Sequence, residues 1–286
     1  MSFITPMLLE KTDQPFYDTN YIFEPKMDGI RLLVSKVGDQ TRMWTRHKNE
    51  ITQRFPELLD VPVDTDVILD GELVCVDPET GSIDFELIME RFSAKKSDKI
   101  KILQKQLPVE YVVFDILHYD GTDLRSIPLL ERKAILDEVM HENAFYKKIS
   151  YIEDRGTDLF AAVEQMKLEG MVCKYKNSKY VSKRSKHWLK LINWMYEDVY
   201  ITGYRKDEFG WVCSRKEGEN FRPIGTLELG TTPQVRQAFY AISKQLITRE
   251  DDKLVELEPV IRCRLKFRNY TRKGLLRTPS FVKFLY

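Results

Sequence analysis

The sequence lacks the closely spaced cysteines that zinc ribbons and disulfide frameworks require. Its four cysteines, Cys75, Cys173, Cys213 and Cys263, stand far apart along 286 residues and form no Cys-x-x-Cys pair. This spacing excludes a zinc ribbon and gives no disulfide framework. No apolar run reaches membrane-spanning length, and the N-terminus lacks the charged and apolar regions of a signal peptide. We therefore expect a soluble protein in a reducing, cytoplasmic location, with no membrane contact.

Net charge is also nearly absent, but the charges are unevenly distributed. The formal net charge is +1, whereas residues 200–286 carry 17 basic and 10 acidic residues (+7) and residues 1–199 carry 28 and 34 (−6). Residues 262–283 include eight basic residues and no acidic one, and residues 174–190 include seven and none. A single charge run is usually a solvated face. Two acid-free runs in one chain favour a phosphate-binding surface.

Apolar residues make up 43% of the chain, which is enough for a sizeable core. No internal repeat or low-complexity segment interrupts it. Apolar patterning in the first part predicts alternating strands and helices, and Thr157 or Asp158 is a candidate cap for the second helix. The expected strands are 21–24, 31–36, 42–45, 66–76, 109–117, 170–174 and 188–192, and the expected helices are 129–143 and 157–167.

The pattern changes near Trp194. Short strands are expected at 198–205, 210–215, 226–230 and 260–268, with one helix at 233–246. Several short strands with one helix in about ninety residues suit a small barrel of the OB type. We therefore divide the chain into domains 1–193 and 194–286.

The sharpest local signal is the segment Glu24-Pro25-Lys26-Met27-Asp28-Gly29-Ile30-Arg31. A lysine between a strand and a glycine turn is held at a defined place near backbone donors. At ordinary residue usage, Lys-x-Asp-Gly-x-Arg arises by chance in well under ~1% of chains this long. Taken alone, the segment could also be a surface Lys–Asp pair beside a turn.

Further segments follow it in a known order, and together they resemble the covalent nucleotidyltransferase superfamily of DNA ligases, RNA ligases and mRNA-capping enzymes. The matching segments are Lys26-Met27-Asp28-Gly29-Ile30-Arg31, Thr45-Arg46-His47, Leu69-Asp70-Gly71-Glu72-Leu73, Tyr111-Val112-Val113-Phe114-Asp115-Ile116-Leu117, Glu169-Gly170-Met171-Val172-Cys173-Lys174 and Trp188-Leu189-Lys190-Leu191. The resemblance implies an α+β fold. A nucleotidyltransferase domain of ATP-grasp-like antiparallel sheets with helices would precede the OB-fold β-barrel.

Within that superfamily, the sequence is most similar to small bacterial and phage ATP-dependent DNA ligases and to the ligase domain of bacterial end-joining ligase D. The tail Thr271-Arg272-Lys273-Gly274-Leu275-Leu276-Arg277-Thr278-Pro279-Ser280-Phe281 carries this similarity. The cysteine spacing excludes the zinc module of NAD-dependent ligases, so ATP is the expected donor. The implied reaction seals nicks in double-stranded DNA during repair, replication or recombination. The alternatives are an RNA ligase, a capping guanylyltransferase, or an inactive OB-type nucleic-acid-binding protein, against which the intact Lys26 motif argues.

The resemblance also assigns roles to individual residues. Lys26 would be the nucleophile that forms lysyl-AMP, and Glu72 and Glu169 would hold Mg²⁺. The DNA-binding candidates are Lys266 and Arg268 with Arg277. The residues expected to bind ATP are Glu24, Lys26, Arg31, Arg46, Glu72, Phe114, Lys174 and Lys190.

General chemistry agrees with these roles. Lysine and arginine can neutralise phosphate oxygens, carboxylates suit Mg²⁺, and an aromatic face suits adenine. Each also has a simpler reading, since Phe114 could be a core residue and Lys174 and Lys190 could be solvated. Glu72 could be an ordinary strand acid, but Gly71 before it indicates close approach by a ligand. Asp70 and Asp115 could be structural, and neither is assigned to the site.

Two departures from the family pattern bear on function. Ile192 stands where many relatives have a second lysine, two residues after Lys190. The chain begins at the catalytic domain, and no long OB insertion that could encircle DNA is visible. We expect a monomer with a modest grip on DNA, and the resemblance leaves room for a DNA-end-binding partner.

Overall fold

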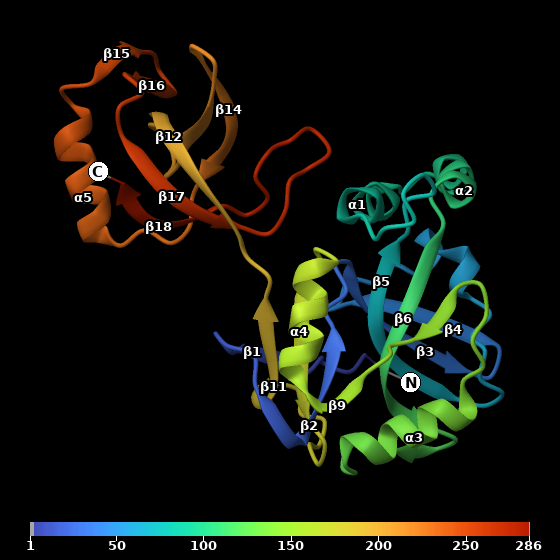
Figure 1. Ribbon diagram of the computed structural model, residues 1–286. Coiled ribbons are helices and arrows are strands. Elements are labelled where there is room, and N and C mark those ends of the chain that lie inside the picture. The colour runs from blue at the N-terminus through green and yellow to red at the C-terminus, as the bar shows by residue number, and fades with distance from the viewer. Residues whose placement is uncertain (1–2, 286) are drawn as a thin grey trace. The chain divides into compact units, whose positions relative to one another are not determined.

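The computed structural model describes residues 3–285 and divides into two compact units, Met1–Asn193 and Trp194–Tyr286 (Figure 1). Two sheets with helices form the first unit, and one curled sheet with one helix forms the second. No helix among the described residues is long and apolar enough to cross a membrane.

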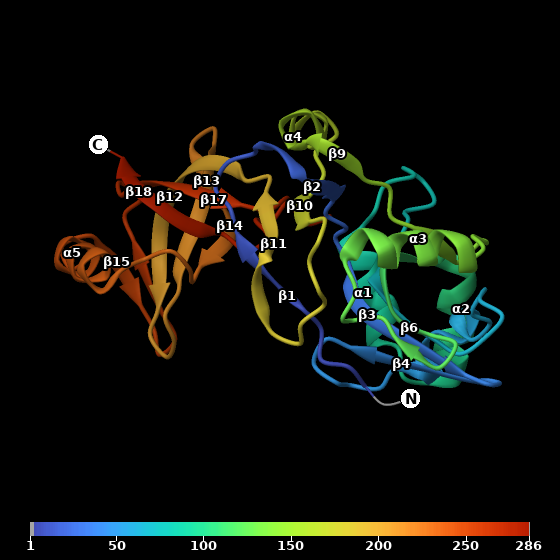
Figure 2. The same cartoon turned by 90° about the horizontal axis from the view of Figure 1, so that it is seen from below.

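The first unit contains two sheets whose strands are mostly antiparallel (Figures 1 and 2). The five-stranded sheet has the order β1 (Leu8–Lys11), β11 (Arg184–Ile192), β10 (Gly170–Tyr175), β2 (Tyr17–Pro25) and β9 (Ile152–Arg155). The six-stranded sheet has the order β4 (Gln40–Thr45), β3 (Ile30–Val37), β5 (Val67–Cys75), β6 (Val109–Tyr119) and β7 (Thr122–Asp123), and β8 (Tyr146–Lys148) pairs with β6. Only the β1–β11 and β6–β8 pairs among these are parallel.

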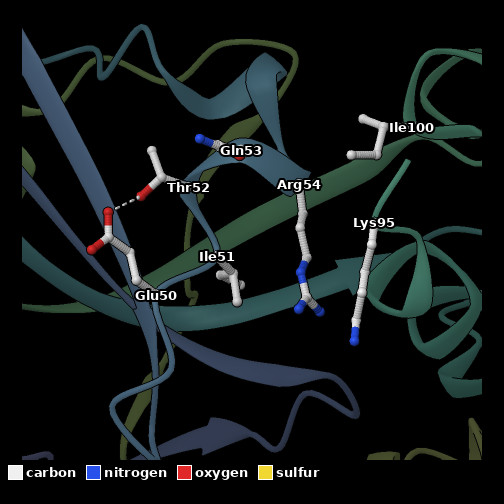
Figure 3. A pocket seen from close by; sticks show the side chains of 7 residues that line it. All are labelled: Glu50, Ile51, Thr52, Gln53, Arg54, Lys95 and Ile100. Atoms are coloured by element: carbon white, nitrogen blue, oxygen red, sulfur yellow. Dashed lines mark hydrogen bonds between the residues drawn. The ribbon is translucent and has the colours of Figure 1, made fainter. Parts of the chain in front are cut away.

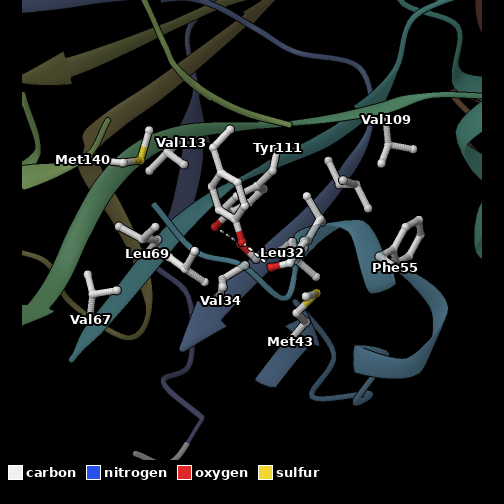
Figure 4. Close-up of a cluster of buried hydrophobic side chains, with 14 of the residues drawn as sticks. Leu32, Val34, Met43, Phe55, Val67, Leu69, Val109, Tyr111, Val113 and Met140 are labelled. Carbon is white, nitrogen blue, oxygen red and sulfur yellow. Dashed lines mark hydrogen bonds between the residues drawn. The ribbon is translucent and has the colours of Figure 1, made fainter. Parts of the chain in front are cut away.

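The outer faces of the two sheets are covered by separate cores. Helix α4 (Gly156–Gln165) packs through Val163 onto Phe23, Met171 and Leu191 of the five-stranded sheet. The larger core covers one face of the six-stranded sheet, where the Tyr111 hydroxyl donates to the carbonyl of Leu32 at 2.9 Å (Figure 4). The remaining helices of this unit are α1 (Phe85–Ser93), α2 (Ser97–Gln106), α3 (Leu129–Val139) and the 3₁₀ turns Thr52–Arg54 and Pro56–Leu58.

A third core joins the inner faces of the two sheets. Ile22 and Trp188 from the five-stranded sheet pack in one cluster with Leu33, Ile68 and Leu117 from the six-stranded sheet. Side chains alternate between the two faces of a strand. Residues two positions away from these apolar ones therefore also lie on the inner faces. They include Glu24, Lys190 and Arg31.

The second unit is a barrel closed around Trp211 and Phe239, whose ring centroids lie 4.1 Å apart. Its strands are β12 (Met195–Arg205), β13 (Trp211–Glu217), β14 (Asn220–Leu227), β15 (Ile247–Glu250), β16 (Leu254–Leu257), β17 (Arg262–Phe267) and β18 (Ser280–Leu285), and its helix is α5 (Pro233–Ser243). β12 pairs with both β13 and β17, and β18 extends the sheet beyond β17. The barrel closes between β18 and the segment just after β14, where the backbone N–H of Phe281 donates to the carbonyl of Leu229 at 2.9 Å. This β-rich unit is OB-like, as the sequence predicted.

Most predicted elements are confirmed, and three details were wrong. A strand was expected at 226–230, but β14 runs from Asn220 to Leu227, because it pairs with β13 along its length and β13 begins at Trp211, opposite Leu227. Helix α4 has no side-chain cap, since Asp158 instead binds Arg155.

Helix α3 ends at Val139, four residues before the predicted end. Beyond it, the Asn143 side chain accepts from the backbone of Phe145 and Tyr146, and this turn replaces further helix. Helices α1 and α2 had not been predicted, and neither had the strands β1, β7, β8, β9, β15, β16 and β18.

Candidate active site

Lys26 lies in the short connection between β2 and β3. Its backbone N–H donates to the carbonyl of Gly170 at 2.9 Å, and its Nζ lies 2.6 Å from Oε2 of Glu169. Gly29 lets this connection press against β5, because a Cβ there would lie only 2.2 Å from the carbonyl oxygen of Leu73. The glycine of the motif is thus required by close backbone packing, and it brings the lysine segment beside Glu72.

Two carboxylates accompany the Lys26 amine. The Glu169 side chain is 2% exposed and that of Lys26 is 18% exposed. Burial raises the pKa of Glu72 to about 7, while Lys26 and Arg31 act to lower it and Glu169 acts to raise it. The three groups therefore interact at close range, as the motif order predicts for a nucleophile and two candidate metal ligands.

A second buried group of charges centres on Glu24. Its Oε1 lies 2.7 Å from Nζ of Lys133, and its Oε2 lies 2.7 Å from Nζ of Lys174. Burial would raise the pKa of Glu24, but the two lysines outweigh burial and lower it. Burial lowers the pKa of Lys174 to about 8 despite Glu24.

Lys133 was missed by sequence reasoning. It shares the buried face of α3 with Leu129 and Leu136, at spacings of four and three residues. A charged residue at such a spacing could have indicated a buried ion pair.

Phe114 stands at a bulge in β6. Asp70 pairs with Asp115 and Gly71 pairs with Val113, so Phe114 is the extra residue of the bulge. Its half-buried ring lies 4.3 Å from Nζ of Lys174 and 5.2 Å from the guanidinium carbon of Arg31. Bulges re-aim side chains next to active sites, and this one directs the Phe114 ring to the charged groups.

The reason given for Gly71 was wrong. A Cβ at Gly71 would lie 2.6 Å from the carbonyl oxygen of Val112 and 2.7 Å from the ring of Tyr111. The close approach at this position is therefore by the neighbouring strand and its ring. The glycine carries no information about a ligand.

Arg31 is held by an acid that the sequence did not assign to the site. Its Nε and one terminal nitrogen donate to both oxygens of Asp70, at 3.0 and 2.7 Å, and its other terminal nitrogen donates to the carbonyl of Met7. The hydroxyl of Tyr180 also donates to Asp70, at 2.6 Å. Burial opposes the charge on Arg31, but Asp70 outweighs burial and raises the Arg31 pKa. Tyr180, like Lys133, was missed, because no local pattern marks a residue whose partner lies 110 positions away.

The other nucleotide candidates are placed differently. Lys190 on β11 pairs with Val172 on β10, which pairs with Glu24, so Lys190 and Glu24 share the inner face. Arg46 is exposed, and its guanidinium lies 3.3 Å from the ring of neighbouring His47. The structure therefore brings most of the predicted residues together and leaves Arg46 at the surface.

An open pocket on the first unit is unrelated to this cluster. Its lining residues are Glu50, Ile51, Thr52, Gln53, Arg54, Lys95 and Ile100 (Figure 3). None of them is a predicted site residue. The charged cluster around Lys26 and Glu24 remains the candidate active site.

The basic candidates of the second unit follow β17. Buried Cys263, Leu265 and Phe267 alternate with Arg262, Arg264 and Lys266 on the outer face. Nζ of Lys266 lies 5.1 Å from the Trp194 ring.

Not all of these basic residues are equally available to phosphate. The guanidinium of Arg264 is bound by both oxygens of Asp198, at 2.7 and 2.9 Å. Arg268 N donates to the carbonyl of Arg277 at 3.1 Å, which places these two candidates side by side. An acid thus neutralises Arg264.

Comparison with known sequences identifies the family of the chain. Residues 6–191 match the family described as ATP dependent DNA ligase domain. The SPbeta prophage-derived DNA ligase-like protein LigB of Bacillus subtilis is 40% identical over 282 residues, which cover 98% of each protein. The chain spans about half the length of archaeal DNA ligases that it also matches.

Solved structures share the fold. The chain resembles the ligase domain of M. tuberculosis LigD, with a TM-score of 0.60 and 22% identity over 99% of this chain and 95% of that one. It also resembles a Lig E DNA ligase described as binding DNA with a minimal scaffold. That TM-score is 0.68, with 16% identity over 99% of this chain and 100% of that one.

Proposed function

The chain belongs to the ATP-dependent DNA ligase family, and we propose that it seals nicks in duplex DNA by transferring AMP through Lys26. The observation that carries this assignment of the nucleophile is the position of Lys26. It follows β2 directly, inside the matched family segment, and its Nζ lies 2.6 Å from the buried carboxylate of Glu169. Glu72, Glu24 and Phe114 surround the same inner face.

In the first step, Nζ of Lys26 attacks the α-phosphorus of ATP. A P–N bond forms, the bond from the α-phosphorus to the oxygen that bridges it to the β-phosphorus breaks, and pyrophosphate leaves with that oxygen. Lys26 must lose its proton before it can attack. Glu169 Oε2 is the nearest acceptor for that proton, and it also fixes the amine in place.

The second and third steps use the same AMP. An oxygen of the 5′-phosphate at a nick attacks the phosphorus of lysyl-AMP, and the P–N bond breaks. The 3′-hydroxyl then loses its proton and attacks the phosphorus of the activated 5′-phosphate. The bond from that phosphorus to the oxygen that bridges it to AMP breaks, and AMP leaves with the bridging oxygen. Lys266, Arg268 and Arg277 of the second unit bind backbone phosphates in this scheme, with the protein acting as a monomer.

Mg²⁺ fits the acids beside Lys26. Within residues 3–285, no group of three or more His, Cys, Asp or Glu side chains is arranged to hold a metal ion. Glu72 and Glu169 are hard oxygen donors that would hold Mg²⁺ together with oxygens of the bound nucleotide. A bound Mg²⁺ supplies positive charge to the phosphate oxygens.

Labelling with α-³²P-ATP tests the proposal. The wild-type chain should form an acid-labile protein–AMP adduct, whereas Lys26→Ala should form none and should seal no nick from ATP. Lys26→Ala should still seal a nick that already carries AMP, because that step needs no new lysyl-AMP. Lys179→Ala, which removes an exposed lysine, is the matched control and should behave as wild type. An adduct on Lys26→Ala, or labelling of wild type by GTP alone, would contradict the proposal.

A further inference from the structure

The carboxylate of Glu24 is clamped between two ammonium groups that come from different elements. Lys133 on α3 contacts Oε1 and Lys174 on β10 contacts Oε2, each at 2.7 Å. All three side chains are at most 4% exposed. Each carboxylate oxygen therefore has its own cation.

Aromatic rings replace water around the two lysines. Nζ of Lys174 lies 4.3 Å from the Phe114 ring and 4.3 Å from the Trp188 ring, and Nζ of Lys133 lies 4.9 Å from the Tyr151 ring. Ring faces attract cations, so they support both ammonium groups without supplying an anion.

A second acid nearby is already paired. Asp115, which acts on Lys174 at longer range, is bound through both oxygens by Arg132 at 2.7 and 2.8 Å. Glu24 is therefore the acid on which both lysines depend, and both lysines keep it ionised.

An ionised carboxylate can accept hydrogen bonds but cannot donate them. It has about four lone-pair positions. The two ammonium groups pair with it as ions, and Oε1 has no hydrogen-bond partner among the described residues, so that oxygen can still accept a hydrogen bond. The purines differ at C6, where adenine carries an amino donor and guanine carries a carbonyl acceptor. A carboxylate fixed as a pure acceptor binds the first group and repels the second.

We propose that Lys133 is a positioning residue for nucleotide choice: together with Lys174 it fixes Glu24 as an acceptor for the 6-amino group of ATP. This inference rests on the proposed function, because it takes the cluster around Phe114 as the base site. Without Lys133, the buried Glu24 has one partner fewer and can take up a proton. A protonated carboxyl group can donate to a 6-keto group, so discrimination against GTP weakens.

The test compares adduct formation from α-labelled ATP and GTP over a range of concentrations. Lys133→Met should raise the KM for ATP, change the rate at saturating ATP much less, and reduce the ATP-over-GTP preference by about tenfold, equivalent to ~1.4 kcal/mol. Lys133→Arg should restore the preference, because it returns the charge. Lys148→Met, which removes a half-exposed lysine 3.4 Å from Asp137, is the matched control and should leave the preference unchanged.

A double-mutant cycle separates positioning from general destabilisation. If Lys133 acts through Glu24, adding Lys133→Met to Glu24→Gln should change the preference little further. If Lys133→Met does not fold, as judged by thermal unfolding, Lys133→Gln takes its place. A wild-type ATP preference in Lys133→Met or Lys133→Gln, or full additivity with Glu24→Gln, would overturn the inference. A wild-type chain that forms no adduct would count against the proposed function instead.

Discussion

Asp70→Asn should destabilise the first unit by about 3 kcal/mol, because it breaks a buried ion pair and leaves Arg31 without its counter-charge. The Asp70 side chain is fully buried, that of Arg31 is 13% exposed, and the pair makes two hydrogen bonds in parallel. Removing one partner of a buried pair costs ~3–5 kcal/mol. The lower end applies, since asparagine keeps one oxygen that can accept from Tyr180. Urea unfolding followed by fluorescence measures the change, with Trp188 as a probe 5.7 Å from the Tyr180 ring.

The matched control is Asp123→Asn, in the same unit. Asp123 also binds an arginine, Arg125, through two oxygens, but the side chains are 52% and 38% exposed. Exposed pairs contribute at most ~1 kcal/mol, because water and salt screen them. Equal losses in the two variants, or a loss below ~1 kcal/mol for Asp70→Asn, would refute the view that burial makes the Arg31 pair structural.

Three other outcomes are expected. Phe114→Ala should weaken ATP binding in adduct-formation assays by ~1–3 kcal/mol, the range for lost base stacking, and an unchanged KM would show a purely structural ring. Lys266→Glu should lower affinity for nicked duplex DNA and reduce the salt slope of log Kd by about one to two, whereas Lys244→Glu, at an exposed lysine just after α5, should not; equal slopes would count against a phosphate contact by β17. Ile192→Lys should leave the adenylation rate unchanged or lower it, because a half-buried ammonium is costly to desolvate; a rise of about tenfold would show a missing charge that Lys190 does not replace.

Much of the fold could be predicted because strand and helix periods follow from burial. The alternation Arg262, Cys263, Arg264, Leu265 predicts a strand with one buried face, and β17 has that arrangement. Helix α2 escaped prediction for the opposite reason. It carries four lysine and glutamine residues among its last six positions, and its buried face consists of Ile100 and Leu103 alone. Such a short stripe is hard to distinguish from a loop.

The candidate site also contains residues that could be predicted from the sequence and residues that could not. Lys26, Glu24 and Glu169 could be predicted, because they lie in short ordered motifs that resemble those of a known family. Lys133 and Tyr180 could not be predicted from short motifs, because their ion pair and hydroxyl contact join residues that are far apart in the sequence. Glu24 and Lys133 meet only when α3 packs beside the inner face of the five-stranded sheet. Periodicity predicts which residues are buried, but it does not predict their partners.

The pairing of charges also orders the groups by their freedom to meet a triphosphate. Arg31 is held by Asp70 through two hydrogen bonds, with a third to a backbone carbonyl. Lys174 is fully enclosed and bound to Glu24. Lys26 is more exposed than either, and one carboxylate oxygen of Glu169 holds its Nζ. Since a phosphate must compete with the existing partner of each cation, we expect it to draw Lys26 from Glu169 more readily than Arg31 from Asp70. Of these three cations, the proposed nucleophile is then the most easily released, and Arg31 is held as a positive charge beside the Phe114 ring.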